Sequence, residues 1–480
     1  MSRRLLRALP LVAALAASWA CAPAPLRAPA TGEASRAALE GPPASGAATG
    51  EAAATAPFDL ELAVASFDTA WSRVRNHHYD TTFGGQDWDA VRTELRPEAL
   101  AARSDAELRR VIMDMVGRLG VSHYVVIPRD AVPSLTPERA AERAADGGAD
   151  RPPADAGLEL RIVDGRLVAW RVRPEGAAAA AGIASGAAVA RLAAVDVGGA
   201  LDRLEALGDA RERQLAESRF LHGVNGMLRG EIGDTMQVGL VRGRDTVPVD
   251  LPFRAAAARM VRFGNLPAMF AQLRTERLDT ADGCVGVLAL SVWMTPLAAE
   301  LDAAIDELRA CRGIVIDLRG NPGGVAGMVM GVGGHFVDTR SALGMMRTRT
   351  TELRFVLNPR RVNPRGQPVE VFGGRLAILV DLMSASTSEI FAAGMQAIGR
   401  ARVFGEVTSG QALPAMAGAL PNGDVLMQAI ADYLVIDGSR VEGRGVLPDE
   451  TVPLRIDDVR AGRDAPLEAA LRWIATGPGD

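Results

Sequence analysis

The chain has 480 residues, of which 48% are hydrophobic and 23% are charged, and its formal net charge at neutral pH is −5. This length predicts two to four folded units, and the balance of residues suits a globular protein. The slightly acidic charge excludes the basic footprint of a protein that binds nucleic acid. All 53 basic residues are arginine, because the sequence contains no lysine.

The first twenty residues predict a signal peptide. Arg3, Arg4 and Arg7 form a positive region, and residues 5–17 form an apolar run that is too short to span a bilayer as a stable helix. We therefore expect residues 1–20 to be removed and the protein to be exported, to a bacterial periplasm or cell envelope.

The small residues before Cys21 resemble a bacterial lipoprotein cleavage box, in which Cys21 would be lipidated. Trp19, and the lack of an aliphatic residue three positions before Cys21, depart from that box. The sequence thus leaves open whether the protein carries a lipid anchor. Residues 21–56 are rich in Ala, Pro, Gly, Thr and Ser, which predicts a flexible linker.

Residues 57–135 predict an N-terminal helical domain. Apolar residues recur at helical spacing in three segments, residues 60–74, 87–95 and 108–119. A glycine turn then leads to Ser122, His123 and a short strand at residues 125–128. A lone histidine after such a turn is more often a capped or core residue than a catalyst. His77 and His78 follow the first helical segment, and we expect both to face solvent.

A polar, proline-rich linker at residues 129–153 precedes a second domain, predicted at residues 154–255. Short strand patterns alternate with glycine turns and an alanine-rich helix, and residues 236–241 and 246–251 predict a hairpin. This order resembles a PDZ domain, which binds a peptide C-terminus through the N–H groups of one loop. The resemblance implies a peptide-binding loop made of Gly157, Leu158, Glu159 and Leu160. A small β-sandwich without a ligand is the alternative.

The remaining chain, residues 256–476, predicts an α/β domain. Apolar strand patterns at residues 285–290, 314–318, 375–380 and 401–405 are separated by helical patterns, and residues 340–370 predict a polar surface excursion. Cys284 and Cys311 each stand just before one of these strands. Two adjacent parallel strands would place them at the same end, so they form either a disulfide or two separate buried thiols.

One stretch of this last domain offers a nucleophile. The serine-rich residues 382–390 follow the strand at residues 375–380 and open a helical pattern, so Ser386 stands at a strand-to-helix turn whose N–H groups can hold a negative charge. Read alone, the stretch is typical of a helix N-cap. Acyl transfer would use the N–H of Thr387, together with that of Gly323 or Gly324, to hold the oxyanion.

Four motifs occur in order and resemble the C-terminal processing peptidases, or tail-specific proteases, and the related tricorn-type serine peptidases. They are Ile-Asp-Leu-Arg-Gly-Asn-Pro-Gly-Gly (residues 316–324), Ser-Ala-Ser-Thr-Ser-Glu (384–389), Gly-Glu-Val-Thr-Ser-Gly (405–410) and Glu-Gly-Arg-Gly-Val-Leu-Pro-Asp (442–449). The resemblance covers about residues 57–476. It implies a multidomain α+β fold with an N-terminal helical domain, a PDZ-like domain and a crotonase/ClpP-like catalytic core.

The family activates its serine in two ways. Many members use a lysine base, whose matching position here is Gln411, and a glutamine amide cannot take a proton at neutral pH. Since the chain has no lysine, a Ser–Lys dyad is excluded. The tricorn-like branch uses a histidine and a glutamate, which match His123, preceded by Ser122, and Glu442. The resemblance thus implies Ser386 as nucleophile, His123 as base, and Ser122 with Glu442 as the groups that orient His123.

Two positions depart from the family pattern: Val121 replaces a common acidic residue, and Met383 replaces a common glycine. The expected function is an exported serine endopeptidase that binds protein C-termini and acts on peptides or unfolded proteins. The alternatives are a non-catalytic binding protein on the same scaffold and a small-substrate esterase or amidase. We expect no cofactor and no metal site, because no His-Glu-x-x-His or paired-cysteine spacing occurs.

Overall fold

The computed structural model describes residues 58–129, 153–261, 269–280 and 283–476. The predicted signal peptide, the linker at residues 21–56, Cys21 and most of the linker at residues 129–153 lie outside these ranges. None of the helices in the described ranges combines the length and the apolar character that crossing a membrane requires.

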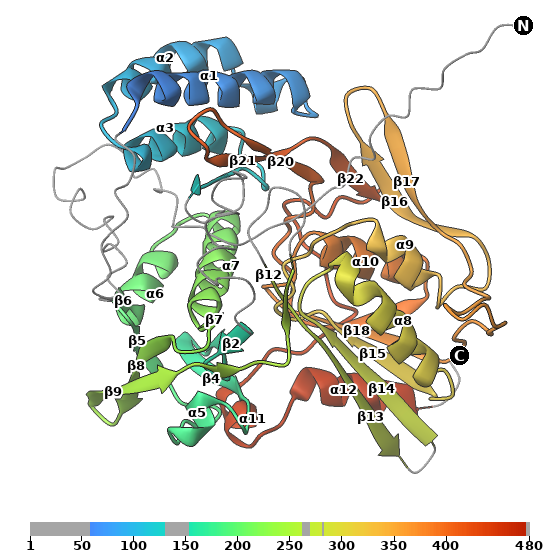
Figure 1. Ribbon diagram of the computed structural model, residues 1–480. Coiled ribbons are helices and arrows are strands. Elements are labelled where there is room, and N and C mark those ends of the chain that lie inside the picture. The colour runs from blue at the N-terminus through green and yellow to red at the C-terminus, as the bar shows by residue number, and fades with distance from the viewer. Residues whose placement is uncertain (1–57, 130–152, 262–268, 281–282, 477–480) are drawn as a thin grey trace, which may run out of the picture.

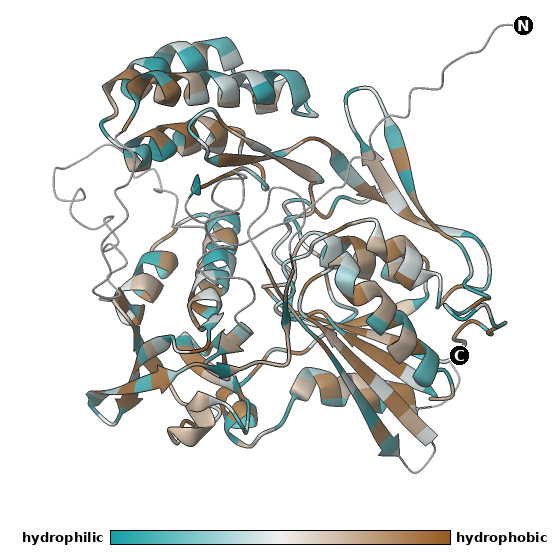
Figure 2. Ribbon diagram, in the orientation of Figure 1, coloured by the Kyte–Doolittle hydropathy of each residue, from teal (hydrophilic) through white to brown (hydrophobic). Residues whose placement is uncertain are grey.

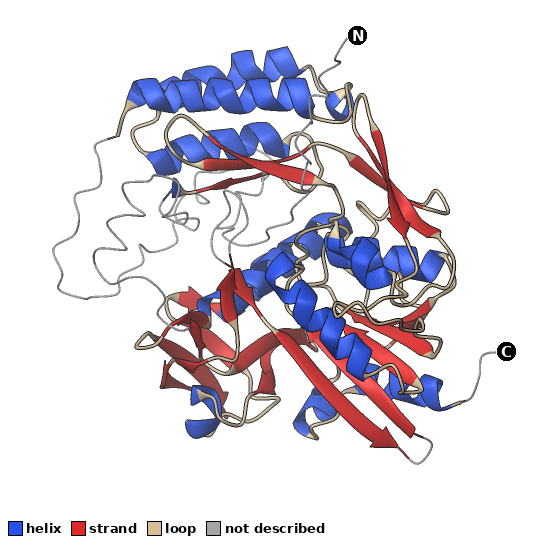
Figure 3. Ribbon diagram, turned by 45° about the vertical axis from the view of Figure 1, so that its right-hand side comes forward, coloured by secondary structure: helices blue, strands red, loops and turns tan. Residues whose placement is uncertain are grey.

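Three helices form the N-terminal part of the described chain. Their first turns are capped by Asp59, Asp87 and Ser104, whose side chains accept from main-chain N–H groups three residues later. The helices are α1 (Leu60–His77), α2 (Trp88–Ala101) and α3 (Asp105–Gly117). Figure 2 shows polar residues on their outward faces, and Figure 3 shows the three helices stacked above a β-hairpin.

That hairpin comes from the far end of the chain. β20 (Ala415–Ala419) and β21 (Val425–Ala429) surround the turn at residues 420–424, and β1 (Val125–Ile127) pairs antiparallel with β21. Leu413, Leu420 and Leu426 share one apolar cluster with the three helices. The N-terminal helices therefore pack directly on the part of the chain that carries Glu442.

The second group of elements has its own apolar cluster, which also contains Met383. Its four-stranded antiparallel sheet has the order β6-β5-β8-β9. The elements are β2 (Pro153–Asp155), β3 (Leu158–Val163), β4 (Arg166–Val172), α5 (Ala177–Ala180), β5 (Val189–Leu192), β6 (Val195–Asp196), α6 (Val197–Glu205), α7 (Ala210–Met227), β7 (Arg229–Glu231), β8 (Thr235–Arg242), β9 (Asp245–Pro252) and β10 (Arg254–Ala255). The predicted hairpin is present as β8 and β9.

A six-stranded sheet with the order β13-β14-β15-β18-β19-β23 forms the centre of the third part. Its inner strands are apolar and almost wholly buried, as parallel strands covered on both faces are. Only the polar edge strand β13 runs antiparallel. The strands are β13 (Leu273–Thr280), β14 (Gly283–Leu290), β15 (Gly313–Asp317), β18 (Arg375–Val380), β19 (Ala401–Gly405) and β23 (Glu450–Thr451).

Helices cover both faces of this sheet (Figure 1). α8 (Ala298–Glu307), α9 (Met328–Gly333) and α10 (Thr387–Ala397) lie on one face, while α12 (Ala465–Ala475) packs against the other and follows the short α11 (Ile456–Arg460). The two cysteines are joined in a disulfide, Cys284 to Cys311, which ties the start of β14 to the segment before β15. The structure thus settles the question that the sequence left open.

The structure differs from the expectations or adds to them at three points. The predicted polar surface excursion at residues 340–370 contains two strands, since β16 (Ser341–Arg347) pairs with β17 (Glu352–Leu357) and with β22 (Asp432–Val435). A short pair, β11 (Arg259–Val261) with β12 (Met269–Ala271), was also not expected. His77 is exposed as predicted, but the prediction for His78 is wrong: its ring is 2% exposed and its Nδ1 lies 2.8 Å from the Tyr124 hydroxyl.

Candidate active site

Three loops meet at the carboxyl ends of three neighbouring parallel strands. Residues 318–324 follow β15, residues 381–386 follow β18, and residues 406–411 follow β19. The Ala385 N–H donates to Asn321 O at 3.0 Å, and the Ser386 N–H donates to Gln411 O at 2.9 Å. The convergence follows from the sheet, because the carboxyl ends of parallel strands lie at one edge.

Ser386 occupies a strained turn between β18 and α10. Its φ of 52° and ψ of −114° lie in a region that residues with a side chain rarely adopt, and it is 5% exposed. Such strain persists only where neighbouring contacts hold it, and a serine in a tight strand-to-helix turn is typical of a nucleophile. His123 also has a positive φ, 64°.

A buried carboxylate lies directly beneath this turn. Glu389 accepts from the Ser386 N–H at 3.0 Å, from the Gln411 N–H at 2.9 Å, from the Gly410 N–H at 2.6 Å and from the Thr408 hydroxyl at 2.5 Å. Burial raises the pKa of Glu389 to about 7, against the opposing effect of these hydrogen bonds. Sequence reasoning gave Glu389 no role in the site, although its spacing from Ser386 is that of a capping box.

A second buried carboxylate, Asp381, supports the turn from the other side. It accepts from the Gly320 N–H at 2.9 Å and the Met383 N–H at 3.0 Å, and it forms an ion pair with Arg161 of β3 at 2.8 Å. Both partners of the ion pair are buried. The loop that carries Ser386 is therefore held through Asp381 by a side chain from β3.

Three of the sequence-predicted residues form one hydrogen-bonded chain. Glu442 accepts from the Ser122 hydroxyl at 2.9 Å, and Ser122 Oγ lies 2.7 Å from His123 Nδ1. Because the single hydroxyl proton points to Glu442, Ser122 Oγ accepts the proton of Nδ1, which leaves Nε2 unprotonated. Burial lowers the pKa of His123 to about 4, so its ring is neutral at pH 7.

Main-chain hydrogen bonds connect the hydrogen-bonded residues Glu442, Ser122 and His123 with the turn at Ser386. Glu442 also accepts from the Ala412 N–H at 2.9 Å, next to Gln411, which accepts from Ser386. Among the described residues, however, no hydrogen bond joins Ser386 Oγ to His123 Nε2. Pairing of β1 with β21 fixes the segment that carries Ser122 and His123 against the far end of the chain.

The two candidate oxyanion glycines differ in their main-chain bonds. The Gly323 N–H donates to Asn321 Oδ1 at 2.9 Å, so it is engaged within its own turn. Gly324 lies opposite Trp293 in a parallel β-bridge, in which the Trp293 N–H donates to Gly323 O and the Val325 N–H donates to Trp293 O. The N–H of Gly324 itself therefore points away from Trp293. The Thr387 N–H opens helix α10, and its side chain donates to Gly324 O at 2.9 Å. The geometry favours Gly324 over Gly323.

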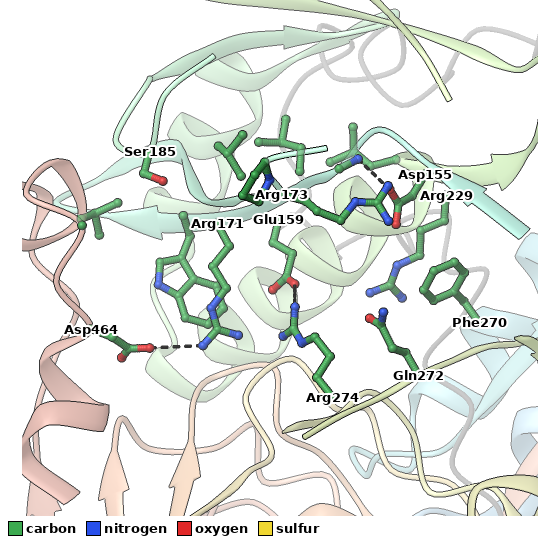
Figure 4. A pocket seen from close by; sticks show the side chains of 18 of the residues that line it. Asp155, Glu159, Arg171, Arg173, Ser185, Arg229, Phe270, Gln272, Arg274 and Asp464 are labelled. Atoms are coloured by element: carbon green, nitrogen blue, oxygen red, sulfur yellow. Dashed lines mark hydrogen bonds and ion pairs between the residues drawn. The ribbon is translucent and has the colours of Figure 1, made fainter. Parts of the chain in front are cut away.

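The predicted peptide-binding residues Gly157, Leu158 and Glu159 line a cavity of about 430 Å³ between β3, β4 and the segment at residues 270–274 (Figure 4). Leu160 is buried behind it. The Gly157 N–H donates to Asp155 Oδ1 at 2.7 Å and the Leu160 N–H donates to Asn225 Oδ1 at 2.8 Å. Side chains thus engage two of the four predicted N–H groups, and the other two residues, Leu158 and Glu159, lie opposite Val172 and Arg171 in the ladder of β3 with β4.

Arginines dominate the charge of this cavity. Five line it, against three carboxylates, and the lining charged residues are Asp155, Glu159, Arg171, Arg173, Arg229, Arg274, Arg463 and Asp464. Burial opposes ionisation of Glu159, but the nearby guanidinium groups, first that of Arg274, lower the pKa of Glu159 to about 2. Within the described ranges, no cluster of His, Cys, Asp and Glu side chains is arranged to bind a metal ion.

Two family models and a curated relative match parts of the chain. Residues 284–452 match the model of peptidase family S41, and residues 65–117 match that of the tricorn protease C1 domain. A probable CtpA-like serine protease of Staphylococcus haemolyticus is 26% identical over 219 residues, which are 45% of this chain and 42% of that protein. This chain therefore matches less than half the length of that relative.

Two solved structures share the fold. The photosystem II D1 C-terminal processing protease matches with a TM-score of 0.53 and 20% identity, over 86% of this chain and 97% of that one. The structure of mature CPAF matches with a TM-score of 0.55 and 12% identity, over 86% and 96% of the two chains. At these identities the matches show a common fold.

Proposed function

Since the chain belongs to the C-terminal processing peptidase family, we propose that it is a serine peptidase that cleaves peptide bonds through an acyl-enzyme on Ser386. The observation that carries the proposal is the hydrogen-bonded chain from Glu442 through Ser122 to His123. That chain leaves a neutral imidazole nitrogen unprotonated and fixes its ring, as a general base requires.

In the proposed reaction, Ser386 Oγ attacks the peptide carbonyl and its proton passes to His123 Nε2. The N–H groups of Thr387 and Gly324 hold the oxyanion of the tetrahedral intermediate. His123 then protonates the leaving amine. In the second half of the reaction, a water molecule gives a proton to His123 and attacks the acyl-enzyme, and Ser386 Oγ leaves and takes the proton back. Proton transfer requires Ser386 Oγ and His123 Nε2 to meet, and such hydrogen bonds often tighten only in the complex with substrate.

The arginine-lined cavity beside β3 is the proposed site for the substrate's C-terminus. A peptide carboxylate is an anion, and guanidinium groups such as that of Arg274 bind carboxylates with good geometry. Addition of the peptide main chain beside residues 157–159, which line the cavity, completes the PDZ-like part of the proposal. Unfolded proteins or peptides are the proposed substrates, and the arginine-led apolar segment at the N-terminus supports export.

A non-catalytic binding protein is the second candidate. The observation that favours it is the lack of a hydrogen bond between Ser386 Oγ and His123 Nε2 in the described part of the chain. Under this alternative, the cavity beside β3 still binds a peptide end, but Ser386 carries out no chemistry.

Labelling with a fluorophosphonate probe separates the two. We expect the folded protein to label at Ser386 at neutral pH and to hydrolyse a fluorogenic peptide, while Ser386→Ala and His123→Ala keep their circular dichroism and lose turnover. Full turnover in Ser386→Ala would refute the peptidase assignment. A folded wild type that neither labels nor hydrolyses peptide would favour the binding protein.

A further inference from the structure

Helix α7 presents a polar stripe to the rest of the molecule. Its members recur three or four residues apart and so lie on one face of the helix. They are Arg211, Gln214, Ser218, His222 and Asn225. Asn225 anchors this face to β3, since its side chain exchanges hydrogen bonds with the main chain of Leu160. Arg211, Gln214 and His222 face the loops around Ser386.

The N-terminal end of the stripe contacts the loop at residues 408–411. Gln214 Nε2 donates to Thr408 O at 2.7 Å, and the Arg211 guanidinium donates to Ser409 O and, at 2.5 Å, to Gly410 O. Three consecutive carbonyl groups are thus held by one helix. A Cβ on Gly410 would lie 2.7 Å from Arg211 Nη1, which shows how closely the guanidinium packs on this loop.

The same loop determines the position of the proposed catalytic groups. Its N–H groups donate to Glu389, Gln411 O accepts from the Ser386 N–H, and the next residue, Ala412, donates to Glu442. The side chains of α7 therefore hold the carbonyl edge of a loop whose other contacts place Ser386 and Glu442.

The middle of the stripe reaches the loop at residues 381–386. His222 is buried, and the charge of Asp381 and a hydrogen bond with the main chain of Met383 both favour its protonated form. Burial lowers the pKa of His222 to about 4, so it is neutral at pH 7. One helix thus touches the loops on both sides of Ser386.

Arg211 also brings charge to the site. Its guanidinium attracts the carboxylates of the partly buried Glu442 and the fully buried Glu389. An arginine stays protonated and cannot serve as a base, so Arg211 does not replace the lysine of other family members. Its available role is to hold the loop and to favour ionised carboxylates next to it.

We propose that Arg211 is a positioning residue, which holds the loop at residues 408–411 and thereby couples the part of the chain at residues 153–261 to the geometry of Ser386 and Glu442. The inference rests on the proposed role of Ser386. It goes further in assigning a function to α7, because the two guanidinium hydrogen bonds hold the carbonyl edge of this loop.

The test compares Arg211→Gln with the control Arg213→Gln. Arg213 lies on the same helix but donates to Leu207 O and not to the loop at residues 408–411. With a short fluorogenic peptide, we expect Arg211→Gln to lower kcat about 10- to 100-fold with little change in KM, and Arg213→Gln to match the wild type. Arg211→Lys keeps the charge but not the planar fork, so we expect it to restore part of kcat.

The pH profile of kcat gives a readout that a merely structural role would not move. The groups facing Glu442 are Ser122, the Ala412 N–H, Tyr79 and Arg211. Loss of the cation raises the pKa of Glu442, so we expect the acid limb of Arg211→Gln to move to higher pH. Arg211→Lys should keep the limb of the wild type.

Hydrogen–deuterium exchange tests the positioning without any turnover. We expect the N–H groups of Gly410 and Gln411 to exchange faster in Arg211→Gln than in the wild type and in Arg213→Gln. Unchanged exchange together with unchanged kcat would overturn the inference. A wild type that neither labels nor hydrolyses peptide refutes the proposed function instead, and the exchange measurement then still decides whether Arg211 holds the loop.

Discussion

Glu442 accepts two hydrogen bonds from Ser122, one from the main-chain N–H at 3.0 Å and one from the hydroxyl at 2.9 Å, across 320 positions of the sequence. The pair fixes the direction of the hydroxyl proton and hence the tautomer of His123. Burial raises the pKa of Glu442, and the hydrogen bonds from Ser122 and Ala412 and the charge of Arg211 oppose that rise. The strength of this link is open to direct measurement.

Glu442→Gln should lower kcat at least about 100-fold, since removal of the group that orients a catalytic histidine has large effects. An amide has one acceptor oxygen and cannot take both bonds from Ser122 while also accepting from Ala412. Steady-state hydrolysis of a fluorogenic peptide measures the effect. Glu450→Gln, at an exposed ion pair with Arg402, is the control and should behave like the wild type. A change of less than twofold in Glu442→Gln would contradict the proposed role.

The pH profile of kcat/KM should have its acid limb below the range of an ordinary histidine. Burial lowers the pKa of His123 to about 4, so the ring stays neutral and able to accept a proton well below pH 6.5. We expect kcat/KM to stay level from pH 8 to about 6 and to fall at lower pH. Circular dichroism at each pH separates this fall from unfolding. A limb centred at or above pH 6.5 would show that His123 is not the base in this environment.

Glu389→Gln should destabilise the fold, although it removes a buried charge. Four donors point at the Glu389 carboxylate, and a glutamine amide would turn its own N–H groups toward some of them. Leaving about two buried donors unsatisfied costs roughly 2–5 kcal/mol. Urea unfolding at pH 8 measures the loss. An unchanged free energy of unfolding would mean that the carboxylate does not hold the turn.

Glu406→Gln should have the opposite effect, which makes it a matched comparison. Burial, followed by repulsion from Asp381, raises the pKa of Glu406 to about 7, and no side-chain hydrogen bond in the described residues supports its charge. A raised pKa favours the protonated form in the fold, so the wild type loses stability as pH rises from about 4.5 to about 7. Glutamine avoids that loss, and we expect a gain of about 1–3 kcal/mol at pH 8 and none at pH 4. A gain that is equal at both pH values would contradict the electrostatic cause.

Gly324→Ala should slow turnover strongly and weaken the fold. A Cβ at this position would lie 2.1 Å from Trp293 O, and the φ of 139° is strained for any side chain. We expect a loss of at least about 2 kcal/mol in the free energy of unfolding and about 100-fold in kcat. Gly327→Ala is the control, because nothing lies within 4 Å of a Cβ there. Equal behaviour of the two variants would remove Gly324 from the proposed oxyanion site.

Replacement of Cys284 and Cys311 by alanine should lower the free energy of unfolding by about 3–4 kcal/mol, as expected for a cross-link that closes a loop of this length. The disulfide spans 27 positions and lies at the start of β14 and β15, away from the loops that carry Ser386. The kcat of the folded variant should therefore stay within about twofold of the wild type. Guanidinium unfolding with and without reductant measures the first effect. Reductant should affect only the wild type.

The sequence predicted the inner strands well, because β14, β15, β18 and β19 are apolar runs bounded by turn residues. It did not predict β16 and β17, although both carry apolar residues, because Arg, Thr and Pro dominate the segments around them. In addition, β16 pairs with β22, which lies far along the sequence. His78 was misjudged for a related reason. Its partner Tyr124 lies 46 positions away, and the residues next to His78 in the sequence do not predict such a contact.

The amino-acid sequence by itself determined the chemical inventory: the absence of lysine, the four motifs, the serine at a strand-to-helix turn, and a histidine and glutamate suited to act with it. The tertiary structure alone decided how these parts meet. The pairing of β1 with β21 brings Ser122 to Glu442, four donors converge on Glu389, and α7 packs its polar stripe on the loop at residues 408–411. The physical reason is that strand and helix patterns depend on neighbouring residues, whereas the contacts of Ser122 with Glu442 and of Arg211 with Gly410 join residues 320 and 199 positions apart. Such contacts form only when the separate apolar clusters pack together.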